Sequence, residues 1–271
     1  MSIVLQTKNL TKSFGKRMAV DHVSMTIRRG DIYGFIGRNG AGKTTFMRLI
    51  LSLARPNSGE ISLFEGEDRR TAGRKIGSLI EDPGLYPRCT AMENLKRLSI
   101  LYGLENTNYE ELLDMVGLGN TGKKKVGEFS LGMKQRLGIA VALLGDPQFM
   151  VLDEPINGLD PAGIKEVRDL VLKLNRERGI TFLISSHLLD ELSKIVTRYG
   201  IINNGRLVEE IDAEQILARQ GTVVRVKVDE PEEAERLHRL LKDNGFAEER
   251  MEIQSQDMEA YFLERIGGWD E

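Results

Sequence analysis

The sequence predicts an α/β fold with a mainly parallel sheet, and two observations predict it. Segments 32–36, 149–152 and 181–184 are short and apolar nearly throughout, as strands buried on both faces of a parallel sheet must be. Segments with helical periodicity, such as 163–178, lie between these strands. Regular alternation of strands and helices is typical of α/β proteins.

The composition limits the kinds of protein that this chain can be. Its 271 residues fit one large domain, or one domain with a small appendage. One cysteine and three histidines exclude an internal disulfide, a multi-cysteine metal site and a histidine-rich cluster. The net charge of −3 argues against a general nucleic-acid binder. We expect no membrane span, because no apolar stretch approaches ~20 residues. We also expect no secretory signal, because the first residues lack a charged segment followed by an apolar one.

The chain is predicted to begin with β structure. Residues 3–35 have the pattern of strands and turns, and we expect an antiparallel β region at the N-terminus, before the buried strand that starts at residue 32. A helix follows over 44–53, and Pro56 and Gly59 end it.

Residues 82–145 are predicted to be an inserted helical subdomain. Two helices are expected, at 91–102 and 109–116, and a glycine directly after each of them ends it. A third helix has one apolar face, marked by Leu137, Val141 and Leu144. After the buried strand at 181–184, a hairpin is expected around Asn204 and Gly205.

The last 51 residues differ in charge from the rest. Residues 221–271 hold 7 basic and 14 acidic side chains, a net charge of −7, which leaves +4 for 1–220. Strands are expected at 224–228 and 251–253, and helices at 232–242 and 257–265. We therefore expect one domain over 1–220 and a small acidic α+β appendage over 221–271.

A glycine-rich loop follows the first buried strand. Residues 37–44 match the pattern G-x-x-x-x-G-K-[ST], whose backbone N–H groups surround phosphate oxygens at the start of a helix. This motif predicts a P-loop NTPase core that binds ATP, with the Thr44 hydroxyl as a ligand of Mg²⁺. The alternative is a plain glycine-rich turn. The predicted nucleotide-binding residues of this segment are Gly37, Arg38, Asn39, Gly40, Ala41, Gly42, Lys43, Thr44 and Thr45.

Two carboxylates follow the apolar strand at 149–152. The carboxyl end of such a strand can deliver an acid to a phosphate site. Asp153 is predicted to hold Mg²⁺, and Glu154 to polarise the attacking water, with Lys43 stabilising charge in the transition state. Acidic residues are also common at the ends of strands. The predicted role of this pair therefore depends on the presence of the phosphate loop.

Further motifs make the chain resemble the ATP-binding subunits of ABC transporters. Residues 129–135, FSLGMKQ, resemble the signature of that family, 157–160 resemble its D-loop, and 185–187 its switch histidine. The resemblance covers about 1–215. It implies an ATPase that forms a head-to-tail dimer, here a homodimer, in which the signature of each chain acts on the partner's ATP. The residues that it adds to the site are Phe14 on adenine, Ser130 and Gly132 in trans, Asp160, and His187 at the γ-phosphate.

Some of these residues also have simpler interpretations. Ser130 is well placed to cap the helix that it precedes. His187 and Phe14 could be ordinary core side chains.

The segment 80–87, IEDPGLYP, resembles the bacitracin-resistance and lantibiotic-immunity branch of the family. Glu81 occupies the position where the family's Q-loop ordinarily has glutamine, and we expect it to ligate or position Mg²⁺; the alternative is a surface residue that has drifted. Leu85 and Tyr86 are the predicted docking surface for integral-membrane permease subunits. The resemblance therefore implies transport, favouring export, at the cytoplasmic face of a membrane. The competing functions are a soluble ABC ATPase acting on ribosomes or DNA and a regulatory nucleotide binder.

Overall fold

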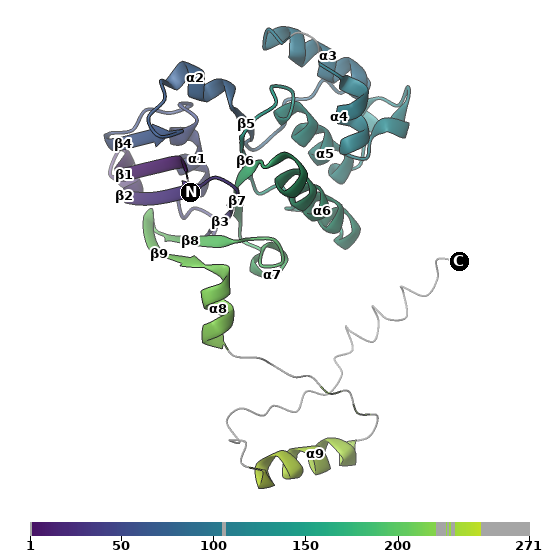
Figure 1. Cartoon of the computed structure of the whole chain (residues 1–271). Coiled ribbons are helices and arrows are strands. Elements are labelled where there is room, and N and C mark those ends of the chain that lie inside the picture. Colours follow the sequence, from purple (N-terminus) through teal and green to yellow (C-terminus); the bar gives the residue numbers. More distant parts are fainter. Residues whose placement is uncertain (1, 105–106, 221–225, 227, 229–230, 245–271) are drawn as a thin grey trace. The chain divides into compact units, whose positions relative to one another are not determined.

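The computed structural model describes residues 2–104, 107–220, 226, 228 and 231–244 (Figure 1). The chain divides into two compact units, Met1–Gln220 and Gly221–Glu271. No helix in the described ranges is long and apolar enough to cross a membrane.

The first unit contains two sheets. The antiparallel sheet has the order β2-β1-β4, and its long strands β1 and β2 form the predicted N-terminal β region. The larger sheet has the order β5-β6-β7-β3-β8-β9; its first five strands are parallel and β9 runs antiparallel. The predicted α/β fold with a mainly parallel sheet is confirmed. The strands are β1 (Ile3–Phe14), β2 (Arg17–Arg28), β3 (Ile32–Ile36), β4 (Ser58–Leu63), β5 (Ile76–Leu79), β6 (Phe149–Asp153), β7 (Thr181–Ser186), β8 (Arg198–Asn203) and β9 (Arg206–Asp212).

The central strands separate two hydrophobic cores. In β6, Phe149 packs with the antiparallel sheet and the helix after the phosphate loop, whereas Met150 packs with the helical subdomain. Strand β3 alternates in the same way, with Tyr33 in the first core and Ile32 in the second. Successive side chains of a strand point to opposite faces, so a strand covered on both faces must be apolar throughout. This is why continuous apolar runs in the sequence identify these strands.

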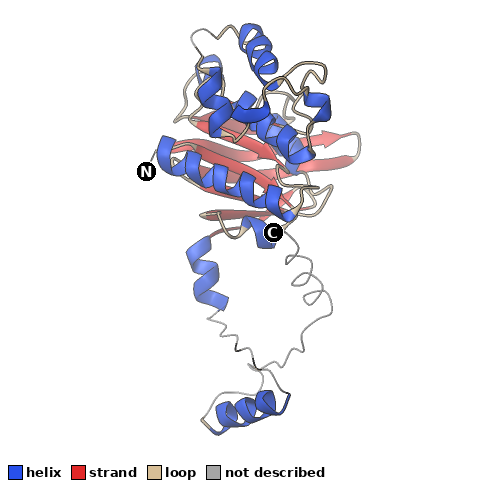
Figure 2. Ribbon diagram, turned by 90° about the vertical axis from the view of Figure 1, so that its right-hand side faces the viewer, coloured by secondary structure: helices blue, strands red, loops and turns tan. Residues whose placement is uncertain are grey.

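Helices cover the strands of the first unit (Figure 2). Three of them form the helical subdomain, where Thr90 begins α3 with a capping box shared with Glu93. The helices are α1 (Lys43–Ile50), α2 (Arg69–Arg74), α3 (Ala91–Leu101), α4 (Tyr109–Met115), α5 (Leu131–Ala142), α6 (Pro161–Arg178), α7 (Leu189–Leu192) and α8 (Ala213–Gln220), with short 3₁₀ turns at Gly119–Thr121 and Val126–Glu128.

Some predicted boundaries are wrong. Helix α1 ends at Ile50 rather than at residue 53, and Leu144 lies beyond the end of α5, although it is buried. Both predictions relied on apolar residues beyond the helix end: Leu144 packs in the turn after α5, whereas Leu53 is exposed in the turn after α1.

The second unit is described in part. Helix α9 (Pro231–Asp243) confirms the helix that was predicted after Pro231. The predicted strand at 224–228 is not formed at Val226 or Val228, the two positions of it that are described. The segments predicted at 251–253 and 257–265 lie outside the described residues.

Candidate nucleotide site

The phosphate loop connects β3 to α1. Gly42 has φ 111°, and a Cβ atom there would collide with the carbonyl oxygen of Ala19. A Cβ on Gly37 would collide with the carbonyl oxygen of Ile202. No side chain caps the amino end of α1. The backbone of the loop is therefore closely packed and forms a cradle. The dipole of α1 favours an anion at the amino end of this helix, next to the loop.

Lys43, the first residue of α1, is buried and lies within the loop. Its Nζ donates a 2.6 Å hydrogen bond to the carbonyl of Gly37 and lies 3.1 Å from Oε1 of Glu154. The ammonium group thus faces the loop backbone and a predicted catalytic carboxylate at once. This position allows a single cation to act on phosphate oxygens and on the group that activates water.

Asp153 is held by hydroxyl groups on both of its oxygens. Thr44 Oγ1 donates to Oδ2 at 2.7 Å, and Ser185 Oγ donates to Oδ1 at 2.6 Å. The carboxylate is 7% exposed, so its orientation is fixed by these two bonds. Thr44 and Asp153, each predicted as a ligand of Mg²⁺, thus lie side by side, although they are 109 residues apart.

Ser185 is a site residue that the sequence analysis did not single out. It stands beside Asp153 in the register of the parallel strands β6 and β7, and its Oγ accepts a 2.9 Å hydrogen bond from the backbone N–H of Glu154. A polar residue at the end of an otherwise apolar strand, next to the strand that ends in Asp153, was the available signal.

Glu154 turns away from Asp153. Its φ of 50° lies in the left-handed region, which non-glycine residues adopt mainly where the surroundings enforce it. Oε2 lies 2.8 Å from Nδ1 of His187, and Oε1 is buried without a hydrogen bond, apart from its ion pair with Lys43. The structure therefore brings the predicted base, the predicted γ-phosphate contact and the phosphate-loop lysine into one cluster.

The side chains of His187 and Phe14 are not core residues. His187 is 31% exposed, and Phe14, at the end of β1, is 59% exposed. The Nζ atom of Lys12 lies 5.2 Å from the centre of the Phe14 ring. An exposed aromatic face of this kind is available for stacking.

Glu81 is paired with a cation and not with the predicted metal ligands. Its Oε1 accepts a 2.7 Å hydrogen bond from Nη2 of Arg48, in the last turn of α1. Among the described residues it has no bond to Thr44 or Asp153. The pair is largely exposed, with 60% of the Glu81 side chain accessible.

The signature residues lie beside the D-loop rather than at the phosphate loop. Ser130 Oγ accepts a 3.2 Å bond from the N–H of Met133, so Ser130 caps α5, as the simpler interpretation predicted. A Cβ on Gly132 would find Leu159 and Gly163 as its nearest neighbours, and Asp160 caps α6. Within one chain, no hydrogen bond of the described segments joins these residues to the phosphate loop.

The chain is similar to proteins of one known family. The ABC transporter family model matches residues 20–157, about half of the chain. The chain belongs to this family, as an ATP-binding subunit. It is therefore an ATPase that binds nucleotide, and the soluble and purely regulatory alternatives are not favoured.

Two relatives illustrate the similarity, and one of them covers nearly the whole chain. The bacitracin transport ATP-binding protein BcrA of Bacillus licheniformis is 40% identical over 99% of both chains. The lantibiotic transport ATP-binding protein SrtF of Streptococcus pyogenes is 45% identical over 76% of this chain and 90% of its own.

Solved cassettes share the fold. The ADP conformation of the ATP-binding cassette MJ1267 superposes with a TM-score of 0.70 at 27% identity, covering 79% of this chain and 92% of that one. A dimeric post-hydrolysis state of the cassette MJ0796, bound to ADP and Pi, gives 0.67 at 27% identity and covers 77% and 98%. Subunits of this family dimerise and work with membrane permease subunits.

Proposed function

We propose that this ATPase powers the export of antimicrobial peptides through separate permease subunits. The observation that carries the proposal is the 40% identity to a bacitracin transport subunit over 99% of both chains. A lantibiotic transport subunit and a linearmycin resistance subunit of Bacillus subtilis, 34% identical over 83% of this chain, are also relatives.

The residues of the loop fit a nucleotide with Mg²⁺. The cradle leaves no room for a Cβ at Gly37 or Gly42, and the side chains beside it include a buried lysine and a threonine–aspartate pair. Thr44 and Asp153 supply the hard oxygen ligands that Mg²⁺ prefers. When bound, Mg²⁺ neutralises charge on the phosphates.

The chain's own residues divide the catalytic work. The loop amides and Lys43 hold phosphate oxygens, and they stabilise the charge that develops on them in the transition state. Glu154 orients the water and accepts its proton at Oε1, which has no hydrogen bond in the described structure and is ion-paired with Lys43. His187 positions Glu154 through Oε2 and lies ready to contact the γ-phosphate.

A head-to-tail homodimer completes the site in this proposal. Ser130 and Gly132, at the amino end of α5, present a second anion site that their own chain does not use. In the dimer they close on the ATP of the partner, with Asp160 holding the adjacent D-loop in place. Phe14 stacks on adenine.

We propose a permease docking surface that is broader than the predicted Leu85 and Tyr86. Tyr86 is 42% exposed, whereas Leu85 is half-buried against the helical core. The end of α3 adds three consecutive exposed side chains, Ile100, Leu101 and Tyr102. Apolar exposure of this kind indicates a protein contact. Docking there would hold the subunit at the cytoplasmic face of the membrane.

Glu81 is proposed to act on Mg²⁺ by exchanging its Arg48 partner for the metal. The exposure of the pair supports this, because an exposed ion pair is weak, worth about 0–1 kcal/mol, and can be broken.

The transport proposal is tested in a host that carries the permease subunits. Replacing the wild-type subunit by Lys43→Ala should make cells sensitive to bacitracin, lantibiotics or linearmycins, as measured by inhibitory concentration. A Lys173→Ala subunit, changed on the exposed surface of α6 and away from the proposed docking surface, is the matched control. Unchanged sensitivity to all three classes, with ATPase activity present in the wild-type subunit, would contradict export of such compounds.

A further inference from the structure

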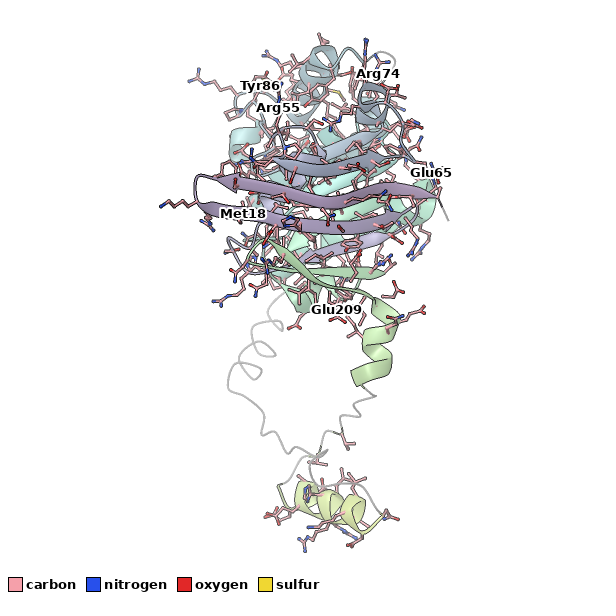
Figure 3. The ribbon with its side chains drawn as sticks, turned by 90° about the vertical axis from the view of Figure 1, so that its left-hand side faces the viewer. Met18, Arg55, Glu65, Arg74, Tyr86 and Glu209 are labelled. Atoms are coloured by element: carbon pink, nitrogen blue, oxygen red, sulfur yellow. The ribbon has the colours of Figure 1, made fainter. Side chains whose placement is uncertain are left out.

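The turn between β1 and β2 brings an arginine to the phosphate loop. Phe14 and Arg17 are paired at the end of the two strands, on either side of the turn at Gly15 and Lys16. Figure 3 shows this end of the sheet, with the neighbouring Met18 labelled. The aromatic ring proposed for adenine and the guanidinium of Arg17 thus come from the same hairpin.

Arg17 contacts the loop directly. Its Nη2 donates a 3.3 Å hydrogen bond to the carbonyl oxygen of Gly40. The same atom lies 3.4 Å from the position of a Cβ on Gly40. Gly40 is in the middle of the segment 37–44, so the guanidinium lies over the loop whose amides are proposed to hold the phosphates.

Arg17 has no acidic partner in the described part of the chain. Its guanidinium carries five N–H donors, and the bond to Gly40 uses one of them. Other arginines of the first unit are within ion-pair distance of carboxylates: Arg48, Arg136, Arg168, Arg178, Arg198 and Arg206. Arg17 is therefore an exposed cation with free donors beside an anion cradle.

We propose that Arg17 is a binding residue for the phosphate chain of the nucleotide. Its remaining donors would form charge-assisted hydrogen bonds to phosphate oxygens, for which a planar guanidinium is well suited. The bond to Gly40 holds the side chain over the loop, so less rotamer freedom is lost on binding. The inference rests on the proposed use of the 37–44 loop for phosphate.

Lys16 provides a matched control. It is the preceding residue of the same turn, it carries the same charge and is exposed, and in the described structure it has no hydrogen bond to the loop. Removing Lys16 changes the net charge of the turn in the same way but leaves the Arg17–Gly40 bond in place.

The test is competition against a fluorescent ADP analogue, with ATP and base-free inorganic tripolyphosphate as competitors. Arg17→Ala and Arg17→Gln should each weaken both competitors by roughly 3–10-fold, because each lacks the charged donor. Arg17→Lys should retain part of the affinity. Lys16→Ala should stay within about 2-fold of wild type, because a surface charge without a contact contributes little.

Three outcomes would overturn the proposal. If Arg17→Gln binds both competitors like wild type, the charge of Arg17 does not contribute to phosphate binding, and the side chain only holds the loop through a hydrogen bond. If Lys16→Ala weakens binding as much as Arg17→Ala, the effect is general charge. If the Arg17 variants weaken ATP but not tripolyphosphate, the contact is to base or ribose. Failure of the wild-type protein to bind either competitor would count against the loop assignment itself, which separates the two failures.

Discussion

Asp153 and Glu154 are neighbours in the sequence, yet their environments differ. Asp153 has both oxygens bound by the hydroxyl groups of Thr44 and Ser185 and is nearly inaccessible. Glu154, with its left-handed backbone, faces Lys43 and His187 instead. Such a separation suits one fixed carboxylate near a metal and one carboxylate free to accept a proton.

Ser185→Ala tests the fixed carboxylate. The change leaves Oδ1 of Asp153 buried without its 2.6 Å bond, so the free energy of unfolding should fall by about 1–3 kcal/mol. The Mg²⁺ concentration needed for half-maximal ATPase activity should rise, because the ligand loses its orientation. Thermal unfolding and Mg²⁺ titration measure the two effects. Ser193→Ala, whose hydroxyl bonds at the exposed end of α7, should change neither; an equal effect of both variants would contradict the assignment.

Glu81→Ala tests the proposed exchange of partners. The free energy of unfolding should fall by at most about 1 kcal/mol, because the ion pair with Arg48 is exposed. Mg²⁺ dependence of the ATPase should shift and transport should weaken. If Arg48→Ala, which removes the same ion pair but not the carboxylate, gives the same result as Glu81→Ala, the pair and not the metal explains it. Unchanged Mg²⁺ dependence and transport in Glu81→Ala would contradict the metal role.

At the scale of elements, the phosphate loop depends on glycine for a steric reason. Gly42→Ala places a Cβ against the carbonyl of Ala19 at a φ that disfavours side chains. We expect ATP binding to be lost and the protein to be destabilised by about 1–3 kcal/mol. Gly179→Ala also has a positive φ, of 65°, but open space around its Cβ, so it should be strained less and should keep ATP binding. Calorimetry of both variants checks this; retained ATP binding in Gly42→Ala would contradict the cradle.

Buried strands and functional loops were predictable from the sequence, and half-exposed elements were not. Strands β3, β6 and β7 are apolar because both faces are covered, so their pattern is unambiguous. Strand β4 begins with three exposed residues and β5 has only four residues, so neither has a clear period. The motifs that contain Thr44 and Asp153 indicated that these two residues lie at the same phosphate site. The pairing of Arg48 with Glu81 depends instead on the positions of two surface side chains, which no motif indicates.

For the whole molecule, the dimer makes a prediction that one chain cannot explain. Lys43→Ala damages the phosphate loop, and Gly132→Asp puts a negative charge at the signature. The fold should tolerate the second change, since a Cβ on Gly132 meets no atom closer than 3.8 Å. Each variant alone should be inactive. When they are mixed, dimers with one intact site form, and ATPase activity should partly return if the signature acts in trans. A mixture as inactive as its components would contradict this arrangement.

The central claim is that the cluster around Glu154 hydrolyses ATP, and Glu154→Gln tests it most directly. The amide keeps the shape of the side chain but cannot accept the proton. Steady-state turnover should fall by ~10²–10⁴, while ATP binding survives. Glu67→Gln, which removes a surface carboxylate paired with Lys75, should hydrolyse ATP like wild type. Normal turnover by Glu154→Gln, measured beside its ATP binding, would contradict the account.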